Sequence, residues 1–118
     1  VLVVNSTALQ AETYMCQTNS GWLKKWYNIS FFEVDITRGF ARFGTNEKWL
    51  DSYKVRSQKA GIGMIYSWKQ DLVVTNDGYI GRTYSFKNKL RIRKDGRYDL
   101  MMGRPGKSWE IKATCKIN

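Results

Sequence analysis

Hydrophobic and polar positions alternate strictly along the last stretch of the chain, residues 109–117. Its apolar residues fall on one face: Trp109, Ile111, Ala113, Cys115 and Ile117. A period of two is typical of a β-strand that buries one face and exposes the other. We therefore expect the chain to end in a half-buried strand.

Shorter alternating runs recur through the rest of the chain. The runs 32–37 and 40–44, separated by a short turn, predict a β-hairpin. Residues 47–56 fit no single period and predict a strand or one helical turn. The last third has the pattern of a meander, with turns expected at 76–78, 87–89, 94–97 and 103–108. About eight strands at regular spacing predict a single-domain, all-β antiparallel barrel or compact sandwich.

The chain contains two cysteines that lie far apart in the sequence. Cys115 is on the apolar face of the last strand, and Cys16 shares a face with Tyr14 near the start of the expected domain. A disulfide between them would join the first and last strands and contribute roughly 4–5 kcal/mol, because it closes a loop of about 100 residues. Such a bond indicates an oxidising compartment. Two unpaired buried thiols in a cytosolic protein are the alternative.

The first residues are typical of the end of a secretory signal peptide, since an apolar run gives way to small and polar residues. We expect residues 1–11 to be a signal-peptide remnant and residues 12–118 to form one β-domain. An ordinary N-terminal strand is the alternative. No other apolar run approaches the length of about 20 residues that a membrane-spanning helix needs. We therefore expect a secreted or periplasmic monomer without a membrane span.

The chain of 118 residues has a formal net charge of +10 and no histidine. It therefore lacks the commonest general base and the commonest metal ligand, and we expect no cofactor and no metal site. Glu33 and Asp35, two residues apart on one predicted strand, are the candidate carboxylates of a hydrolase or nuclease. The same spacing is also typical of the solvated side of a strand.

Basic residues are concentrated in the last third of the chain. Residues 82–118 contain eleven basic and three acidic residues, a net charge of +8, against +2 for residues 1–81. The outer faces of neighbouring strands adjoin in a meander, which predicts a continuous basic sheet face that attracts polyanions. The alternative is a solvated face whose charges block edge pairing. The candidate binding residues are Arg82, Lys89, Arg91, Arg93, Lys94, Arg97 and Lys112.

Residues 21–27 mix aromatic rings with two lysines. Aromatic rings beside cations can stack bases or sugars. The alternative is a loop whose tryptophan rings cap one end of the barrel.

Two short motifs carry a resemblance to known proteins. Tyr14-Met15-Cys16 and Ala113-Thr114-Cys115 resemble the motifs of small exported bacterial β-domains, which have Tyr-x-Cys near the mature N-terminus and a cysteine in the last strand. The plan is also similar to that of the periplasmic or membrane-bound c-type lysozyme inhibitor family. This resemblance implies an eight-stranded antiparallel barrel.

The inhibitory segment of that family reads Ser-Gly-Ser-Gly-Ala-Lys-Tyr. Gly61, Gly63 and Tyr66 keep its spacing and form a candidate inhibitory loop, whereas residues 60, 62 and 65 are alanine and isoleucine in place of its serines and lysine. The resemblance thus implies an enzyme inhibitor that would use this loop.

Together these patterns predict an exported, non-catalytic binding domain whose basic sheet face engages an anionic partner: an acidic protein, a glycan or a nucleic acid. The first alternative is a periplasmic enzyme inhibitor or immunity protein of lysozyme-inhibitor-like architecture. The second is a histidine-free hydrolase or nuclease.

Overall fold

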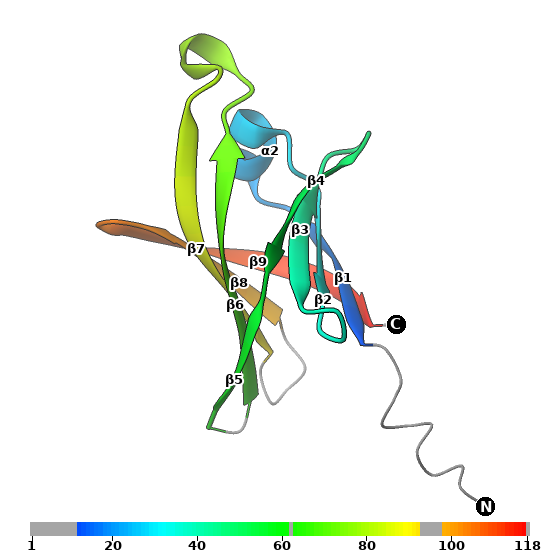
Figure 1. The fold of residues 1–118 in the computed structure, drawn as a ribbon. Helices are drawn as coiled ribbons and strands as arrows, with labels where there is room; N and C mark the ends of the chain where they lie inside the picture. Colours follow the sequence, from blue (N-terminus) through cyan, green and yellow to red (C-terminus); the bar gives the residue numbers. More distant parts are fainter. Residues whose placement is uncertain (1–11, 62, 93–97, 118) are drawn as a thin grey trace, which may run out of the picture.

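The computed structural model describes residues 12–61, 63–92 and 98–117, which form one antiparallel sheet that curls into a nearly closed barrel (Figure 1). The predicted signal-peptide remnant, residues 1–11, lies outside the described residues. The all-β antiparallel prediction is confirmed, with nine strands instead of about eight. The strands are β1 (Thr13–Thr18), β2 (Phe31–Asp35), β3 (Phe40–Gly44), β4 (Trp49–Lys54), β5 (Arg56–Ala60), β6 (Gly63–Val73), β7 (Thr83–Ile92), β8 (Tyr98–Arg104) and β9 (Lys107–Ile117).

The strand order β4-β3-β2-β1-β9-β8-β7-β6-β5 places the first and last strands side by side in the middle of the sheet. Its two edges are β4 and β5, which follow one another in the chain with only Val55 between them. Near this seam the Tyr53 hydroxyl donates a hydrogen bond of 3.3 Å to the Asp71 carbonyl. The Val55 N–H donates one of 2.9 Å to the Gly39 carbonyl. The Tyr53 bond joins β4 to β6 across the seam, whereas the Val55 bond extends the pairing of β3 with β4 beyond Phe40 and Lys54.

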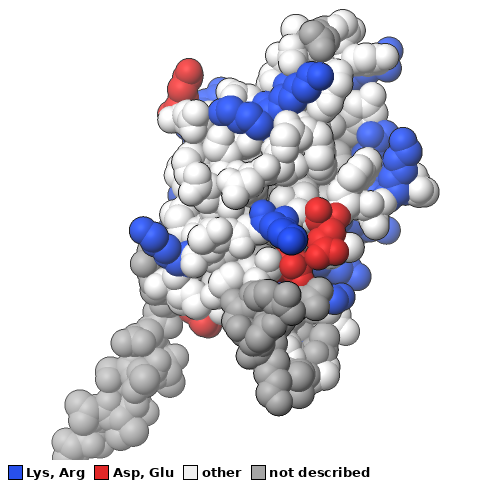
Figure 2. All heavy atoms as spheres, turned by 180° about the vertical axis from the view of Figure 1, so that it is seen from behind, with Lys and Arg blue, Asp and Glu red and all other residues white. Residues whose placement is uncertain are grey.

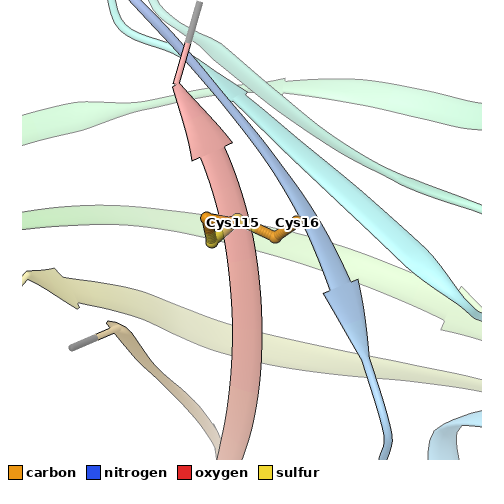
Figure 3. Close-up of a disulfide and its surroundings, with 2 residues drawn as sticks. All are labelled: Cys16 and Cys115. Carbon is orange, nitrogen blue, oxygen red and sulfur yellow. A yellow bond between two sulfur atoms is a disulfide. The ribbon is translucent and has the colours of Figure 1, made fainter.

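A disulfide between Cys16 and Cys115 links β1 to β9 (Figure 3). The two residues lie directly opposite one another in the antiparallel register of these strands. Cys16 is 1% exposed and belongs to the hydrophobic core. The predicted bond between the first and last strands is therefore confirmed.

Alternation of side chains determines what fills the barrel. In β6 the buried Trp68 and Leu72 alternate with the exposed Lys69, Asp71 and Val73. The same period of two runs through β7, because successive side chains in a strand point to opposite faces. The largest fully buried apolar side chains are Phe32, Phe43, Phe86, Leu23, Ile29, Leu72, Leu90, Leu100 and Met102.

Residues 21–27 form a short helix, α2 (Gly21–Tyr27), where a loop was predicted. The helix ends at Asn28, whose φ of 59° is left-handed and whose N–H caps the last turn. Leu23 and Tyr27 face the core. The carbonyl of Trp26 accepts a 2.8 Å hydrogen bond from the N–H of Thr75, in the segment that follows β6. Accordingly, α2 lies beside the ends of β6 and β7 (Figure 1).

The turn predicted at 87–89 is wrong, because these residues lie in the middle of β7. Asn88 is 1% exposed, and its amide donates a 2.9 Å hydrogen bond to Gln70 Oε1. The indole N–H of Trp68 donates a 2.6 Å bond to the same oxygen. A buried polar contact inside the barrel therefore lets this polar triplet continue the strand.

Other local predictions also need adjustment. The turn predicted at 76–78 is part of a wider connection, residues 74–82, which contains a 3-10 turn, η1 (Asp77–Tyr79). The next strand begins only at Thr83. The irregular stretch 47–56 contains β4 and the start of β5, so the strand alternative is confirmed there. The expected turn at 94–97 lies outside the described residues.

Candidate functional site: a basic hollow on the outer face

The structure distributes the predicted binding residues over several places. Arg93, Lys94 and Arg97 lie outside the described residues. The guanidinium of Arg82 stacks 4.9 Å from the centroid of the Tyr79 ring, at the connection between β6 and β7. Arg82 is therefore at the end of the barrel, away from the middle of the sheet face.

One row across the outer face of the late strands alternates in charge. Arg91 on β7 lies opposite Asp99 on β8, which lies opposite Lys112 on β9. The described side chains therefore do not form an uninterrupted basic surface along this row. The face shown in Figure 2 agrees, since its blue side chains occur in separate groups with acidic atoms between some of them.

Basic side chains gather instead where β4 and β5 meet β6 and β7. There they line an open hollow of about 580 Å³, here called the basic hollow. Its charged lining residues are Lys54, Arg56, Lys69, Lys87 and Lys89. Of the predicted residues that the structure describes, only Lys89 belongs to it. Lys54, Arg56 and Lys69 come from the part of the chain with little net charge, which is why charge totals along the sequence missed them.

Strand register holds two lysines of the basic hollow directly against one another. Lys69 on β6 is the cross-strand partner of Lys87 on β7, and both side chains are exposed. Like charges directly opposite across strands destabilise a sheet. The next outward residue on β6, Asp71, accepts a hydrogen bond from the Ser85 hydroxyl. No acidic residue lines the hollow among the described side chains.

The candidate catalytic carboxylates are engaged in structural contacts. Glu33 accepts a 2.9 Å hydrogen bond from Arg42 Nε, and the Asp35 carboxylate accepts one of 2.9 Å from the Arg38 backbone N–H. Both carboxylates are 8% exposed. The Arg42 guanidinium also lies 4.4 Å from the centroid of the Trp49 ring. These acids thus fix β2 to β3 and to the turn after β2.

We expect Arg42→Met to lower the free energy of unfolding by about 1–2 kcal/mol, between the values for exposed and buried ion pairs. The substitution keeps much of the aliphatic volume but leaves the nearly buried Glu33 without its cation. Urea denaturation measures the change. Arg38→Met is the matched control, because that side chain is 77% exposed and 3.8 Å from Asp35. An equal loss in both variants would contradict this explanation.

The candidate inhibitory loop lies at the β5–β6 hairpin. Gly61 has a φ of 62° in the turn, and Gly63 begins β6. Tyr66 is 4% exposed, and its ring centroid lies 5.9 Å from that of Tyr14 inside the barrel. Burial raises the pKa of Tyr66. Insertion of Tyr66 into an enzyme cleft would therefore require the tyrosine to leave the core.

The predicted aromatic segment contributes to a second hollow. Trp22, Trp26 and Tyr27 of α2 line a pocket of about 320 Å³ at the end of the barrel, together with rings from β7, β9 and η1. The idea that these tryptophans lie at a barrel end is thus confirmed, although they are carried by a helix.

The part of the chain that the structure describes is residues 12–61, 63–92 and 98–117. It contains no cluster of three or more His, Cys, Asp or Glu side chains able to hold a metal ion. None of its helices has the length and apolar character needed to cross a membrane. Neither finding adds a candidate site.

The fold and its basic hollow define a single-disulfide β-barrel domain with an open cationic surface. Comparisons with protein-family models, curated proteins and solved structures found no match. The resemblance to the lysozyme inhibitor family therefore stays a prediction.

Proposed function

We propose that this chain is a non-catalytic binding domain that holds an anionic polymer in the basic hollow. The observation that carries this proposal is the direct cross-strand pairing of Lys69 with Lys87 in a hollow whose described lining residues include no acid. Two apposed ammonium groups are unfavourable in the free protein. A phosphate, sulfate or carboxylate between them would accept hydrogen bonds from both and offset their repulsion.

A polymer fits the basic hollow better than a single small anion. The five cations extend from the end of β4 across β6 and β7, so no compact anion can contact all of them. Lys89 and Arg56 are separated across the sheet only by Ser67, which pairs with both. A chain with repeated charges can occupy the Lys69–Lys87 pair and this second row together. Such multiple contacts make affinity depend strongly on salt.

The disulfide supports a location outside the cytosol, since structural disulfides form and persist in oxidising compartments. We therefore place the proposed function in a secreted or periplasmic setting. The catalytic alternative has less support, because Glu33 and Asp35 hold ion pairs in the sheet. The inhibitor alternative is weakened by the burial of Tyr66.

The test compares polymers and charge variants. Affinity for heparin, single-stranded DNA and polyglutamate is measured between 50 and 200 mM salt, with the wild type and with Lys69→Gln/Lys87→Gln. We expect at least one polymer to bind with affinity that falls steeply with salt. The affinity of the double variant at low salt should be lower than that of the wild type by about tenfold or more. For DNA, the slope of log affinity against log salt should become shallower by about one to two units.

The control double variant is Lys112→Gln/Lys116→Gln, which removes the same charge from the outer face of β9. Equal losses in the two double variants would show that net charge alone drives binding. Absence of binding to all three polymers at low salt would reject the proposed function. The identity of the polymer that binds distinguishes glycan, nucleic acid and acidic protein as the class of partner.

Substitutions of this lysine pair should weaken polymer binding but stabilise the folded protein. Lys87→Gln alone is expected to raise the free energy of unfolding by about 0.2–1 kcal/mol, because it removes a like-charge cross-strand pair. Urea denaturation at low salt measures the gain, which 0.5 M salt should largely abolish. A loss of stability in Lys87→Gln would mean that the lysine pair is not repulsive in the folded protein.

A further inference from the structure

The pocket at the end of the barrel has an unusual lining for its size. Seven of the nine residues around its volume of about 320 Å³ are aromatic, and a single one is charged. The rings come from α2, η1, β7 and β9, and the charged residue is Arg104 at the end of β8. We call this feature the aromatic pocket. None of its lining residues belongs to the basic hollow.

The walls of the aromatic pocket are held by contacts among the rings themselves. The Trp22 ring lies nearly parallel to Phe86, at 28° and 6.1 Å between centroids. Trp109 packs against the same Trp22 ring at 5.2 Å. One turn further along the same face of α2, Trp26 meets Tyr79 edge to face at 6.2 Å. Such aromatic pairs are individually favourable, so the pocket is formed before any ligand arrives.

Arg104 supplies the positive charge of the aromatic pocket. Its guanidinium lies 3.9 Å from the centroid of the Tyr84 ring and 5.9 Å from that of Phe86. These contacts fix the guanidinium plane but use none of its N–H donors. Both ion pairs formed within the described part of the chain involve other arginines, Arg38 and Arg42. A guanidinium beside apolar rings forms stronger hydrogen bonds to an anion than one in open water.

Tyr27 adds a polar group near this cation. Burial raises the pKa of its phenol, and the nearby Arg104 guanidinium acts in the opposite direction. The hydroxyl is therefore protonated at neutral pH, as a phenol of ordinary pKa also is, and it can donate a hydrogen bond. The Tyr27 phenol and the Arg104 guanidinium are thus near one another, while aromatic rings form most of the remaining wall.

We propose that the aromatic pocket binds a small flat organic acid, with one or two fused aromatic rings that carry a single carboxylate. The rings of such a ligand would stack between the tryptophans, and its carboxylate would accept hydrogen bonds from Arg104. The volume lies at the lower end of small-molecule sites, which favours a compact ligand over a long acyl chain. A sugar would need many polar partners for its hydroxyl groups. No residue of this site lines the basic hollow, although Arg104 also lines a third hollow together with Lys69 and Lys87.

The test uses 2-naphthoate as the probe and 2-naphthalenemethanol as its uncharged counterpart. Binding to the wild type is followed by the indole N–H signals in a nitrogen-15 NMR titration. We expect saturable shifts at Trp22, Trp26 and Trp109, which line the pocket, and little change at Trp49 and Trp68, which do not. The uncharged probe should bind at least about tenfold more weakly, since it lacks the charge-assisted hydrogen bond.

Arg104→Gln should lower the affinity for 2-naphthoate by a similar factor and leave that for 2-naphthalenemethanol nearly unchanged. Arg82→Gln is the matched control, because Arg82 also stacks on a tyrosine ring but does not line the pocket. Equal binding of the two probes to the wild type would overturn the proposal, and this comparison requires no variant. Absence of saturable shifts, or shifts spread over all five indoles, would also overturn it.

Failure of the aromatic-pocket proposal is distinguishable from failure of the proposed polymer binding. Lys69→Gln/Lys87→Gln should still bind 2-naphthoate with wild-type affinity, because neither lysine lines the aromatic pocket. Loss of 2-naphthoate binding in this double variant would contradict the separation of the two sites.

Discussion

Replacement of both cysteines by alanine should lower the free energy of unfolding by about 4–5 kcal/mol, the chain-entropy value for a loop of this length. The disulfide joins residues 99 positions apart, so its removal frees almost the whole described chain in the unfolded state. A domain of this size has a total stability of about 5–15 kcal/mol. The loss is therefore a large share of the total. Urea denaturation of Cys16→Ala/Cys115→Ala against the oxidised wild type measures it.

The reduced wild-type protein is the control for this prediction. It keeps both sulfur atoms in the sheet and loses only the covalent bond, whereas the alanine variant also loses the packing of the buried Cys16. We expect reduction to account for most of the loss. A decrease of less than about 1 kcal/mol on reduction would mean that the unfolded chain already keeps β1 and β9 together, since the entropic contribution depends on an open unfolded state.

Phe43→Ala should cost about 3–5 kcal/mol, the range for truncation of a fully buried phenylalanine. Phe43 on β3 is 0% exposed, and its ring meets Phe32 edge to face at 5.8 Å. It also meets Trp68 on β6 at 6.4 Å, across the interior of the barrel. The truncation would leave a cavity at the contact between the two halves of the sheet. Urea and thermal denaturation measure the loss.

Phe31→Ala provides the comparison for Phe43→Ala. Phe31 is also in the β2–β3 hairpin, opposite Gly44, but its side chain is only partly buried. The same change of residue should therefore cost clearly less there. Equal losses at both positions would show that hairpin propensity, not burial in the barrel, determines the cost.

The fold could be predicted from the sequence wherever one face of a strand meets water. The alternation along 109–117 identified β9, and the cysteine faces identified its partner strand. Prediction failed where the polarity of a residue did not indicate whether its side chain is buried. The triplet at 87–89 has the composition of a turn, yet Asn88 is buried against Gln70. The helix at 21–27 was missed although Trp22 and Trp26, and Leu23 and Tyr27, have the i, i+4 spacing of a helix, because seven residues are too few for the period to stand out.

The candidate site was less predictable than the fold. Charge counted along the chain located Lys89 but not Lys54, Arg56 or Lys69. Strand pairing brings Arg56 and Lys69 to the basic hollow, and Lys54 joins it from the end of β4. Arg91 and Lys112 were expected to reinforce one another. The intervening Asp99 separates them in the sheet, and only strand pairing reveals that position.

The seam between β4 and β5 is a point at which the chain could begin and end without a change in strand pairing. Among the described strands only the β1–β9 ladder joins neighbours that are not consecutive in sequence, and Tyr14 lies opposite Ile117 in it. A circular permutant that links Ile117 to Thr13 and starts at Arg56 would run through all nine strands in strict spatial order. Its contact order would fall, which is associated with faster folding. The cysteine bridge would then span only one hairpin, and most of its entropic contribution would be lost.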